Sequence, residues 1–385
     1  MLKNCNSADA PPKISSPKPS SLKHGGRLNQ AVKQYALEHN QVENNDSWLD
    51  LSTGINPNGW PVPTLPENSY NRLPEDDDGL VETACEYYQT QKILPVAGSQ
   101  EAIQLLPFIF QHYQLLPDQA KVGIISPCYA EHEFQWRKNN FTIVHLNTQN
   151  ITQHIDNLDV LLVINPNNPT GELISKKNLQ KWLLKLRQKN AYLIIDEAFM
   201  DSIAEQSLIQ KESPENLIVL RSVGKFFGLA GVRCGFVIAP EKILNLLHYH
   251  QGPWSVSGPA RWVVKHALAD QSWIKSNKSM LEQSATRLEN TLRKHLTNDL
   301  ATFNISGTVL YQTLYIDTAE QLFEQLCQQK ILVRLLDKSC HCDSCLSQSK
   351  HPHATHQGLR FGLPKNHLQW QHLESALTNI FSAHF

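Results

Sequence analysis

Long apolar runs and a surplus of either charge are both missing from this sequence. No apolar stretch approaches the roughly 18 residues that a membrane helix needs, and the Pro-, Ser- and Lys-rich N-terminus has no apolar segment typical of a secretory signal. Lys and Arg number 35 and Asp and Glu number 36, which leaves a formal net charge of -1. We therefore expect no membrane association and no nucleic-acid partner.

Cysteine is also scarce for the length of the chain. The sequence has 385 residues and eight cysteines, of which five are scattered and three lie close together. This number does not make a disulfide scaffold, and it indicates a reducing cytoplasm. With 41% hydrophobic residues, the chain is long enough for two domains and a large buried core.

What the sequence does contain is an alternation of short apolar runs with helical segments such as Lys177–Lys189. The runs are rich in branched or aromatic residues and occur at Val122–Ser126, Thr142–Leu146, Val160–Ile164, Tyr192–Ile195, Leu217–Leu220 and Gly235–Ile238. This alternation predicts an α/β fold with a mostly parallel sheet and helices on both faces. Since the ligand sites of such sheets lie beyond the carboxyl ends of the strands, residues at those ends are the candidates for function.

Three strand ends carry side chains that suit a planar, nitrogen-containing ring. Tyr129 could stack on such a ring, and Asn168 lies in the rigid turn Asn165–Gly171, NPNNPTG. Asp196 closes a buried run, where a carboxylate is costly unless a cation such as a protonated pyridine nitrogen pairs with it. Without that context, Tyr129 would be an ordinary half-buried tyrosine and Asp196 a helix N-cap.

Lys225 lies in the Gly-rich stretch Arg221–Phe236, RSVGKFFGLAGVRCGF. A lysine among apolar and small residues loses its proton more readily and can act as an amine nucleophile. Ser222 and Arg233 would supply a hydroxyl and a guanidinium to a phosphate group. Taken alone, such a lysine is more often a surface residue.

Two Gly-containing helix entries suit an anion, because free backbone N–H groups point out of a helix N-terminus. The run Gly98–Gln100, GSQ, precedes an apolar helix expected at Ala102–Tyr113. The run His24–Gly26, HGG, precedes helical spacing at Leu28–His39. An ordinary Ser N-cap and a flexible entry turn are the alternatives for these two runs.

The elements GSQ, NPNNPTG, DEAF and SVGKFFGLAGVRCGF follow one another in a fixed order. Together they resemble the fold-type I enzymes that use pyridoxal 5'-phosphate (PLP), in the branch that contains histidinol-phosphate aminotransferase. Within that branch, HGGRL, STGINP, RLPEDDDGL, SPCYAEHEFQW, GPWSVSGPA and LRFGLP are most similar to the L-threonine-O-3-phosphate decarboxylases of cobalamin biosynthesis. The resemblance runs from about Lys23 to the C-terminus.

The resemblance implies a large PLP-binding domain with a mostly parallel sheet and a smaller α/β domain built from both chain ends. The expected division is a disordered tail at 1–21, an N-terminal arm or lid and the start of the small domain at 22–60, the large domain at 61–270, and the small C-terminal domain at 271–385 with a Cys/His-rich insertion at 338–357. It also implies a homodimer with the active sites near the subunit interface.

The resemblance further implies a role for each matching residue. Lys225 would hold PLP covalently, Asp196 would pair with the pyridinium nitrogen and make the ring an electron sink, and Asn168 would bond the ring hydroxyl oxygen. Tyr129 would stack on the ring. The cofactor phosphate would be bound by Gly98, Ser99, Gln100, Ser222 and Arg233. Substrate binding would fall to Arg360 for the carboxylate, and to His24, Arg334 and the Gly25-Gly26 backbone for the phosphate.

The implied reaction is the decarboxylation of L-threonine O-3-phosphate to (R)-1-aminopropan-2-yl phosphate. An aminotransferase of the histidinol-phosphate type would use the same Lys225 and Asp196, so these two residues do not discriminate between the reactions. A PLP-fold protein that only binds or regulates is a further alternative, and the intact Lys225 and Asp196 pair argues against it.

Two positions depart from the related aminotransferases. Phe199 replaces a tyrosine that contacts the ring oxygen, and Leu73 replaces a tyrosine that reaches the neighbouring subunit's cofactor phosphate. Tyr70 could substitute for the second tyrosine. Cofactor contacts at these two points are therefore open.

A Cys/His-rich run lies between Arg334 and Arg360. It contains Cys340, Cys342 and Cys345, followed by His351, His353 and His356. Zinc or an iron–sulfur cluster could bind there, although the C-x-C-x-x-C spacing is not a standard paired framework. A flexible loop with incidental cysteines is the alternative, and PLP chemistry needs no metal.

Overall fold

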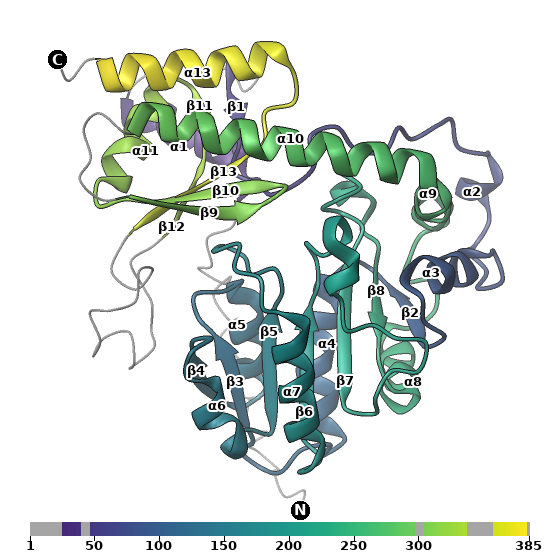
Figure 1. The fold of residues 1–385 in the computed structure, drawn as a ribbon. Coiled ribbons are helices and arrows are strands. Elements are labelled where there is room, and N and C mark those ends of the chain that lie inside the picture. Colours follow the sequence, from purple (N-terminus) through teal and green to yellow (C-terminus); the bar gives the residue numbers. More distant parts are fainter. Residues whose placement is uncertain (1–24, 40–46, 297–302, 337–356, 383–385) are drawn as a thin grey trace, which may run out of the picture.

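The structure is a computed structural model, and it describes residues 25–39, 47–296, 303–336 and 357–382. A seven-stranded sheet forms the larger part, in the order β2-β8-β7-β6-β5-β3-β4 (Figure 1). Its strands are β2 (Ile93–Val96), β3 (Lys121–Ile125), β4 (Thr142–Leu146), β5 (Val160–Ile164), β6 (Tyr192–Asp196), β7 (Leu217–Ser222) and β8 (Gly235–Ile238).

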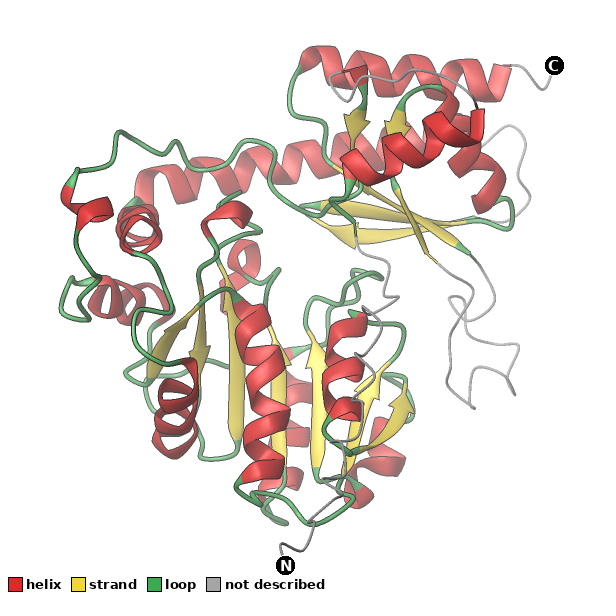
Figure 2. Ribbon diagram, turned by 180° about the vertical axis from the view of Figure 1, so that it is seen from behind, coloured by secondary structure: helices red, strands yellow, loops and turns green. Residues whose placement is uncertain are grey.

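The larger sheet is buried on both faces, as its nearly continuous apolar strands require. Successive residues of β5 alternate between two cores: Leu161 and Val163 pack into one, and Leu162 and Ile164 into the other. Figure 2 shows helices on both faces of this sheet. Its helices and turns are α3 (Leu80–Tyr88), α4 (Ser99–His112), α5 (Ala130–Lys138), α6 (Ile151–His154), η2 (Ile155–Asn157), α7 (Lys176–Arg187), η3 (Asp201–Gln206), η4 (Ala230–Val232), α8 (Glu241–Gln251) and α9 (Gly258–Ala269).

The predicted parallel sheet is confirmed from β3 to β7, which pair in parallel, while β8 runs antiparallel to both β7 and β2. Edge strand β2 was not predicted, because it has only four residues and contains Pro95. Proline is tolerated at a sheet edge, where its missing N–H leaves no ladder bond unmade. A short strand with an internal proline carries little signal in the sequence.

The smaller part is an antiparallel four-stranded sheet in the order β12-β13-β10-β9. Its strands are β9 (Asn304–Thr308), β10 (Tyr311–Tyr315), β12 (Arg334–Leu336) and β13 (Gly358–Gly362). Beside it, β1 (Leu49–Asp50) pairs in parallel with β11 (Ile331–Leu332), so an early segment and a late segment of the chain meet here. The helices described beside the smaller sheet are α1 (Leu28–His39), α11 (Ala319–Gln328) and α13 (His367–Ser382), while the short helix α2 (Asn68–Asn71) packs on α9 of the larger part.

Helix α10 (Gln271–Leu296) runs from the larger part to the smaller part (Figure 1). Its 26 residues correspond to a length of about 39 Å. It packs on α13 and on β10 at the smaller sheet. One rigid helix therefore contacts both parts of the molecule.

Three hydroxyl groups of the smaller sheet bind the Asn165–Gly171 turn of the larger part. Tyr311 Oη donates to Asn167 O at 2.6 Å and Thr313 Oγ1 donates to Pro169 O at 2.7 Å. Ser306 Oγ donates to Thr170 O at 2.6 Å. These bonds fix the turn against the smaller sheet.

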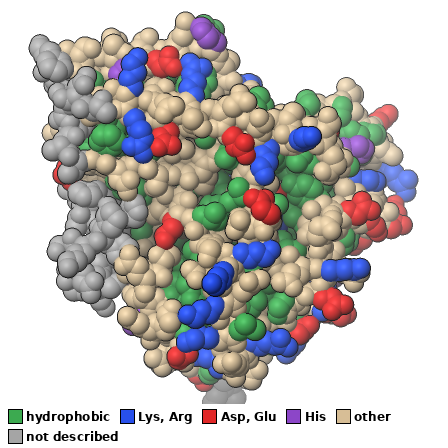
Figure 3. Space-filling view, in the orientation of Figure 1, with side chains coloured by type: hydrophobic (Ala, Val, Ile, Leu, Met, Phe, Trp, Pro, Cys, Tyr) green, Lys and Arg blue, Asp and Glu red, His purple; other side chains and the backbone are tan. Residues whose placement is uncertain are grey.

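Acidic and basic side chains both occur across the face drawn in Figure 3, in keeping with a net charge of -1. Of the helices that the structure describes, none combines the length and the apolar character of a membrane span.

Candidate active site

A cavity with a volume of about 360 Å³ lies between the carboxyl ends of the larger sheet and the smaller sheet. Its wall includes Lys225 and Asp196 from the larger sheet, Arg334 and Arg360 from the smaller sheet, and Gly25 from the arm. The cavity is thus placed where ligand sites of parallel sheets are found.

Most of the residues predicted for the site share this cavity. Those that line it are Gly25, Gly26, Ser99, Gln100, Tyr129, Asn168, Asp196, Ser222, Lys225, Arg233, Arg334 and Arg360. Gly98 packs directly behind it against Arg233. His24 lies outside the described residues, and its role stays a prediction.

Lys225 lies in the turn that follows β7 and extends toward the cavity. Its Nζ is 5.6 Å from the centroid of the Phe199 ring. Burial and the positive charges of Arg360 and Arg233 lower the pKa of Lys225 to about 8, against an opposing effect of Asp196. An appreciable fraction of Lys225 is therefore the neutral amine near neutral pH, which is the form that attacks a carbonyl carbon.

Asp196 ends β6 and is buried together with a histidine that the sequence did not reveal. His132 Nε2 lies 2.8 Å from Asp196 Oδ2, and Ala198 N donates to Asp196 Oδ1 at 3.0 Å. His132 is only 1% exposed. With Asp196 ionised, the carboxylate can only accept, so His132 carries a proton on Nε2. This pair fixes the orientation of the carboxylate at the cavity wall.

Tyr129 is fixed by a chain of polar side chains. Its Oη donates to Gln100 Oε1 at 3.2 Å, and Gln100 Nε2 donates to Glu131 Oε2 at 3.1 Å. Since a carboxylate accepts, this chain sets the amide orientation of Gln100 and directs the Tyr129 proton to Gln100 Oε1. Burial and the charges of Glu131 and Asp196 raise the pKa of Tyr129 to about 12. The Gln100 side chain, expected at a phosphate, is therefore already used to orient the ring of Tyr129.

The N-terminus of α4 opens onto the cavity beside a guanidinium. Gly98 has φ +74°, a conformation that strains other residues, and a Cβ there would lie 2.4 Å from Arg233 Nη2. Ser99 begins the helix, and Ser222 ends β7. Helix N–H groups, two hydroxyls and a guanidinium at one place are groups that suit a phosphate.

Arg334 on β12 and Arg360 on β13 are direct cross-strand partners, and both line the cavity. Residues opposite each other in an antiparallel pair have their side chains on one face, and like charges in this position destabilise the sheet. An anion between the two guanidinium groups would remove that repulsion. The sequence predicted both residues as anion ligands but did not show that they are neighbours.

Arg360 is buried without an acidic partner among the described residues. It is 8% exposed; Nη1 donates to Asn168 Oδ1 at 2.6 Å and Nη2 donates to Ser52 O at 2.8 Å. Its Nε is buried and has no partner. Burial and the nearby Arg334 lower the pKa of Arg360 to about 10, although Tyr311 opposes this shift. A carboxylate from a ligand would satisfy both the charge and the free N–H groups.

The arm residues Gly25 and Gly26 pack against the segment after β1. A Cβ on Gly25 would lie 2.2 Å from Ser52 O, the oxygen that also accepts from Arg360. Gly26 N donates to Ser52 Oγ at 2.9 Å, and Ser52 Oγ donates to Asp50 Oδ1 at 2.6 Å. The Gly26 N–H, expected to receive a substrate phosphate, is thus bound within the protein.

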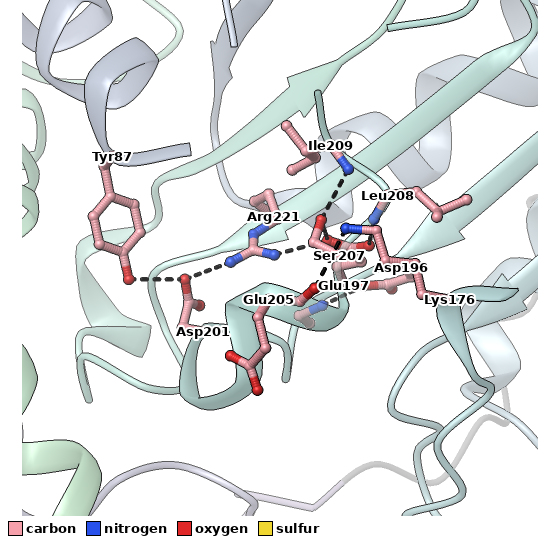
Figure 4. A network of polar contacts seen from close by, with 11 residues as sticks. Tyr87, Lys176, Asp196, Glu197, Asp201, Glu205, Ser207, Leu208, Ile209 and Arg221 are labelled. Carbon is pink, nitrogen blue, oxygen red and sulfur yellow. Dashed lines mark hydrogen bonds and ion pairs between the residues drawn. The ribbon is translucent and has the colours of Figure 1, made fainter. Parts of the chain in front are cut away.

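Figure 4 shows a network of polar contacts around Arg221, with Asp196 close by. Arg221 Nη1 donates to Glu197 Oε2 at 2.8 Å and Nη2 donates to Asp201 Oδ1 at 2.6 Å, while Ser207 Oγ donates to Glu197 Oε2 at 2.6 Å. Although burial opposes it, the two carboxylates raise the pKa of Arg221. Glu197 and Arg221 directly adjoin Asp196 and Ser222 in the chain, so the network supports the ends of β6 and β7. In the sequence, the only sign of this network was the charged residue Arg221 inside an apolar run.

The two departures from related aminotransferases have different surroundings. Phe199 packs edge to face on Tyr311, with ring centroids 5.2 Å apart, and Tyr311 uses its hydroxyl on Asn167 O. Tyr311 therefore does not replace the missing hydroxyl of residue 199. Leu73 and Tyr70 are 63% and 64% exposed and do not line the cavity of their own chain.

The predicted metal ligands Cys340, Cys342 and Cys345 lie outside the described residues. Within the described ranges, no group of three or more His, Cys, Asp or Glu side chains could hold a metal ion. The described cysteines are free thiols: Cys85, Cys128, Cys234 and Cys327. The metal site stays a prediction.

The charged side chains that line the cavity are strongly unbalanced. The cations are Lys225, Arg233, Arg334 and Arg360, and the one carboxylate among the lining residues is Asp196. Such a wall attracts ligands with several negative charges.

Comparison with known proteins agrees with this geometry. The model of the family "Aminotransferase class I and II" matches residues 69–352. A protein named threonine-phosphate decarboxylase from Pseudomonas aeruginosa is 38% identical over 356 residues, which cover 92% of this chain and 97% of that protein. Another of that name from Sinorhizobium sp. is 35% identical over 320 residues, covering 82% and 90%.

Among solved structures, the histidinol-phosphate aminotransferase from Clostridium acetobutylicum superimposes with a TM-score of 0.69. The superposition covers 87% of this chain and 99% of that one at 22% identity. At this identity the likeness concerns the fold alone, and it confirms the expected fold-type I architecture.

Proposed function

Since the chain belongs to the aminotransferase class I and II family, we propose that it is a PLP-dependent lyase that decarboxylates L-threonine O-3-phosphate. The products are CO2 and (R)-1-aminopropan-2-yl phosphate, a step of cobalamin biosynthesis. The two relatives at 38% and 35% identity both carry the name of this activity.

The residues at the cavity fit PLP. Asp196, held by His132, is a buried carboxylate suited to a protonated ring nitrogen, and the Gly98–Ser99 helix entry with Arg233 is suited to its phosphate. When bound, PLP supplies a conjugated ring that accepts the electron pair released at the substrate Cα. Lys225 would carry the cofactor covalently.

Other cofactor roles follow from position. Tyr129, oriented through Gln100, would lie against the ring, and Asn168 would bond the ring hydroxyl oxygen. Ser222 would add a hydroxyl to the phosphate site. These assignments rest on the lining of the cavity and on the family motif.

One observation carries the choice of substrate: the cross-strand pair of Arg334 and Arg360. Arg233 is next to the helix entry, whereas Arg334 and Arg360 line the cavity from the smaller sheet. An amino acid with a carboxylate and a phosphate supplies two anions for these two guanidinium groups. A phosphorylated amine without a carboxylate supplies only one.

The positions of these anchors bear on the reaction. Arg360 would hold the carboxylate and Arg334 the phosphate, while the amino end would lie at the cofactor site beside Lys225. These three anchors would fix the rotation of the substrate about its Cα bonds. The bond between Cα and the carboxylate is the one that a lyase breaks, and Arg360 would hold this carboxylate in place for that step. Lys225, in its ammonium form, would be the group at hand to deliver a proton to Cα in place of CO2.

Purified holoenzyme mixed with threonine phosphate tests this proposal by CO2 release, with and without a 2-oxo acid. Histidinol phosphate is tested in parallel. We expect CO2 from threonine phosphate alone and no dependence on the oxo acid. Turnover only with the oxo acid would make the protein an aminotransferase, and no turnover of either compound would favour a binding protein.

Free threonine is the matched substrate, because it lacks only the phosphate. The charge-assisted bonds of a phosphate are each worth roughly 1.5–3 kcal/mol, so free threonine should be a very poor substrate. Deletion of the chain through Gly26 should likewise impair turnover while PLP stays bound. Equal activity with free threonine would contradict recognition through Arg334.

We further propose a cytoplasmic homodimer, with the division into arm, large domain and small domain given above. Free thiols among the described cysteines support the compartment, and family membership supports the dimer. Exposed apolar side chains at Tyr70, Leu73 and Trp254 offer a surface for a second copy. Light scattering tests the dimer, and a fully active monomer would contradict it.

A further inference from the structure

The turn that carries Lys225 is held from outside through its backbone carbonyls. Lys225 O accepts from Asn56 N at 3.1 Å, and Phe227 O accepts from Trp60 N at 2.9 Å. Between them, Phe226 O accepts from Asn56 Nδ2 at 2.9 Å. Three consecutive carbonyls of the lysine turn therefore bind one short segment of the N-terminal part.

The two backbones lie in direct contact. Gly228 has φ +66°, and a Cβ on it would lie 2.5 Å from Gly59 Cα. A Cβ on Gly59 would lie 2.9 Å from Phe227 O. With no room for a side chain, any displacement of segment 56–60 is passed on to the lysine turn.

Asn56 has a fixed amide orientation. It is 3% exposed, and its Oδ1 accepts from Asn58 N at 2.9 Å, which identifies the other atom as the nitrogen. Both hydrogens of that nitrogen are used, on Phe226 O and on Asn277 Oδ1 at 3.0 Å. Asn56 thus joins the lysine turn to Asn277.

Asn277 is a completely buried polar residue on α10. It is 0% exposed, and its Nδ2 points back to Phe226 O at 3.4 Å. Helix α10 also packs on β10, the strand that pairs with the Arg360 strand. Through this helix, the lysine turn and the strand that holds Arg360 share one rigid support.

We propose that Asn56 and Asn277 are positioning residues, which set where the Lys225 amine stands relative to Arg360. The inference rests on the proposed role of Lys225. Neither asparagine lines the cavity itself, so neither contributes to substrate binding directly. Their loss should therefore lower the rate of the chemical step and leave substrate affinity nearly unchanged.

The test uses the single variants Asn56→Ala and Asn277→Ala of the full chain. In each, we expect kcat to fall about tenfold and KM to stay within about twofold, the scale of one lost buried hydrogen bond. In cofactor-free protein, the pH midpoint of PLP uptake should rise above the wild-type midpoint near 8, because a loosened turn admits water to the amine.

Asn216→Ala is the matched control. Asn216 is also a buried asparagine, 7% exposed, whose Nδ2 donates to Leu183 O at 3.3 Å and to Ala191 O at 3.0 Å. It lies just before β7, at the end opposite the lysine turn. Its loss should lower stability by a similar amount while kcat and the uptake midpoint stay at wild-type values.

Equal effects from Asn216→Ala, or wild-type kcat and midpoint in both Asn56→Ala and Asn277→Ala, would overturn the inference. If Asn56→Ala does not fold, Asn277→Ala carries the test. A wild-type protein that releases no CO2 would refute the proposed function, while the uptake midpoints would still decide on the two asparagines.

Discussion

Two buried arginines of this protein, Arg360 and Arg221, should respond differently to substitution by methionine: the first mainly through activity and the second mainly through stability. Arg360 has no carboxylate partner among the described residues, and Arg221 has two, Glu197 and Asp201. We expect Arg360→Met to lower the free energy of unfolding less than Arg221→Met does and to abolish most activity. Arg221→Met should unfold or strongly destabilise the chain.

The magnitude for Arg360 comes from two opposing effects. Its pKa falls to about 10, so keeping it charged at neutral pH costs the folded protein on the order of 3 kcal/mol, at ~1.4 kcal/mol for each tenfold change in protonation. Removing the charge recovers that cost. It also removes the bonds to Asn168 and Ser52, which are worth roughly 1.5–3 kcal/mol each. The net change in stability is therefore about 0–3 kcal/mol.

The same substitution removes the N–H groups that would bind a substrate carboxylate. Two charge-assisted bonds at roughly 1.5–3 kcal/mol each correspond to a fall of about 10²–10⁴ in kcat/KM. For Arg221→Met, two carboxylates are left buried and unpaired, which costs about 3–5 kcal/mol or more. Urea unfolding of both variants and CO2 release by Arg360→Met are the measurements.

A near-wild-type kcat/KM for Arg360→Met would refute its role at the carboxylate. A loss of stability as large as that of Arg221→Met would refute the claim that Arg360 is held at an energetic cost. Thermal shift gives a further check, because threonine phosphate should raise the melting temperature of the wild type and not of the variant.

The other predictions concern the site residues that the larger part of the molecule supplies. PLP uptake by cofactor-free protein should rise with pH through about 8, because the lowered pKa of Lys225 makes the amine neutral above that value; Lys225→Ala should fold and bind no PLP covalently. Because the folded protein releases this proton at a lower pH than the unfolded chain does, Lys225 should make the protein more stable as pH rises above about 8. Asp196→Asn should retain some PLP and lose most activity, since a neutral amide cannot stabilise a protonated ring nitrogen, as absorbance and CO2 assays would report. Gln100→Leu should lower kcat about tenfold by freeing the ring of Tyr129, with PLP affinity changed less than in Arg233→Met.

Each of these outcomes can fail separately. A lysine-linked cofactor in Lys225→Ala, or an uptake midpoint near that of ordinary lysines, would contradict the assignment of Lys225. Near-normal activity of Asp196→Asn would contradict the electron-sink role. A larger loss of PLP affinity in Gln100→Leu than in Arg233→Met would return Gln100 to the phosphate.

The strands of the larger sheet could be predicted because their apolar runs report burial on both faces. The ends of β6 and β7 likewise placed Asp196 and Lys225 at one edge, and the structure brings them together at the cavity. His132 could not be predicted, since its partner Asp196 is 64 positions away in the chain. A histidine on the first turn of a helix carries no sign of such a contact.

The buried ion pairs and hydrogen bonds that support the site could not be predicted from the sequence either. Arg221 lay in the stretch that drew attention to Lys225, but its carboxylate partners are 20 and 24 residues away. Asn56 and Asn277 are 221 positions apart. Composition and spacing report which face of an element is buried, whereas pairing between distant elements depends on how they pack.

The three hydroxyl bonds from Tyr311, Thr313 and Ser306 to the Asn165–Gly171 turn bear on how the protein gains activity during refolding. A chain in which only the larger sheet has formed would carry Lys225 and Asp196 without Arg334 and Arg360 facing them. When the two sheets dock, the cavity is completed, and the backbone carbonyls of the Asn165–Gly171 turn gain their hydroxyl donors at the same time. Recovery of enzyme activity should therefore follow the docking step, later than the recovery of secondary structure.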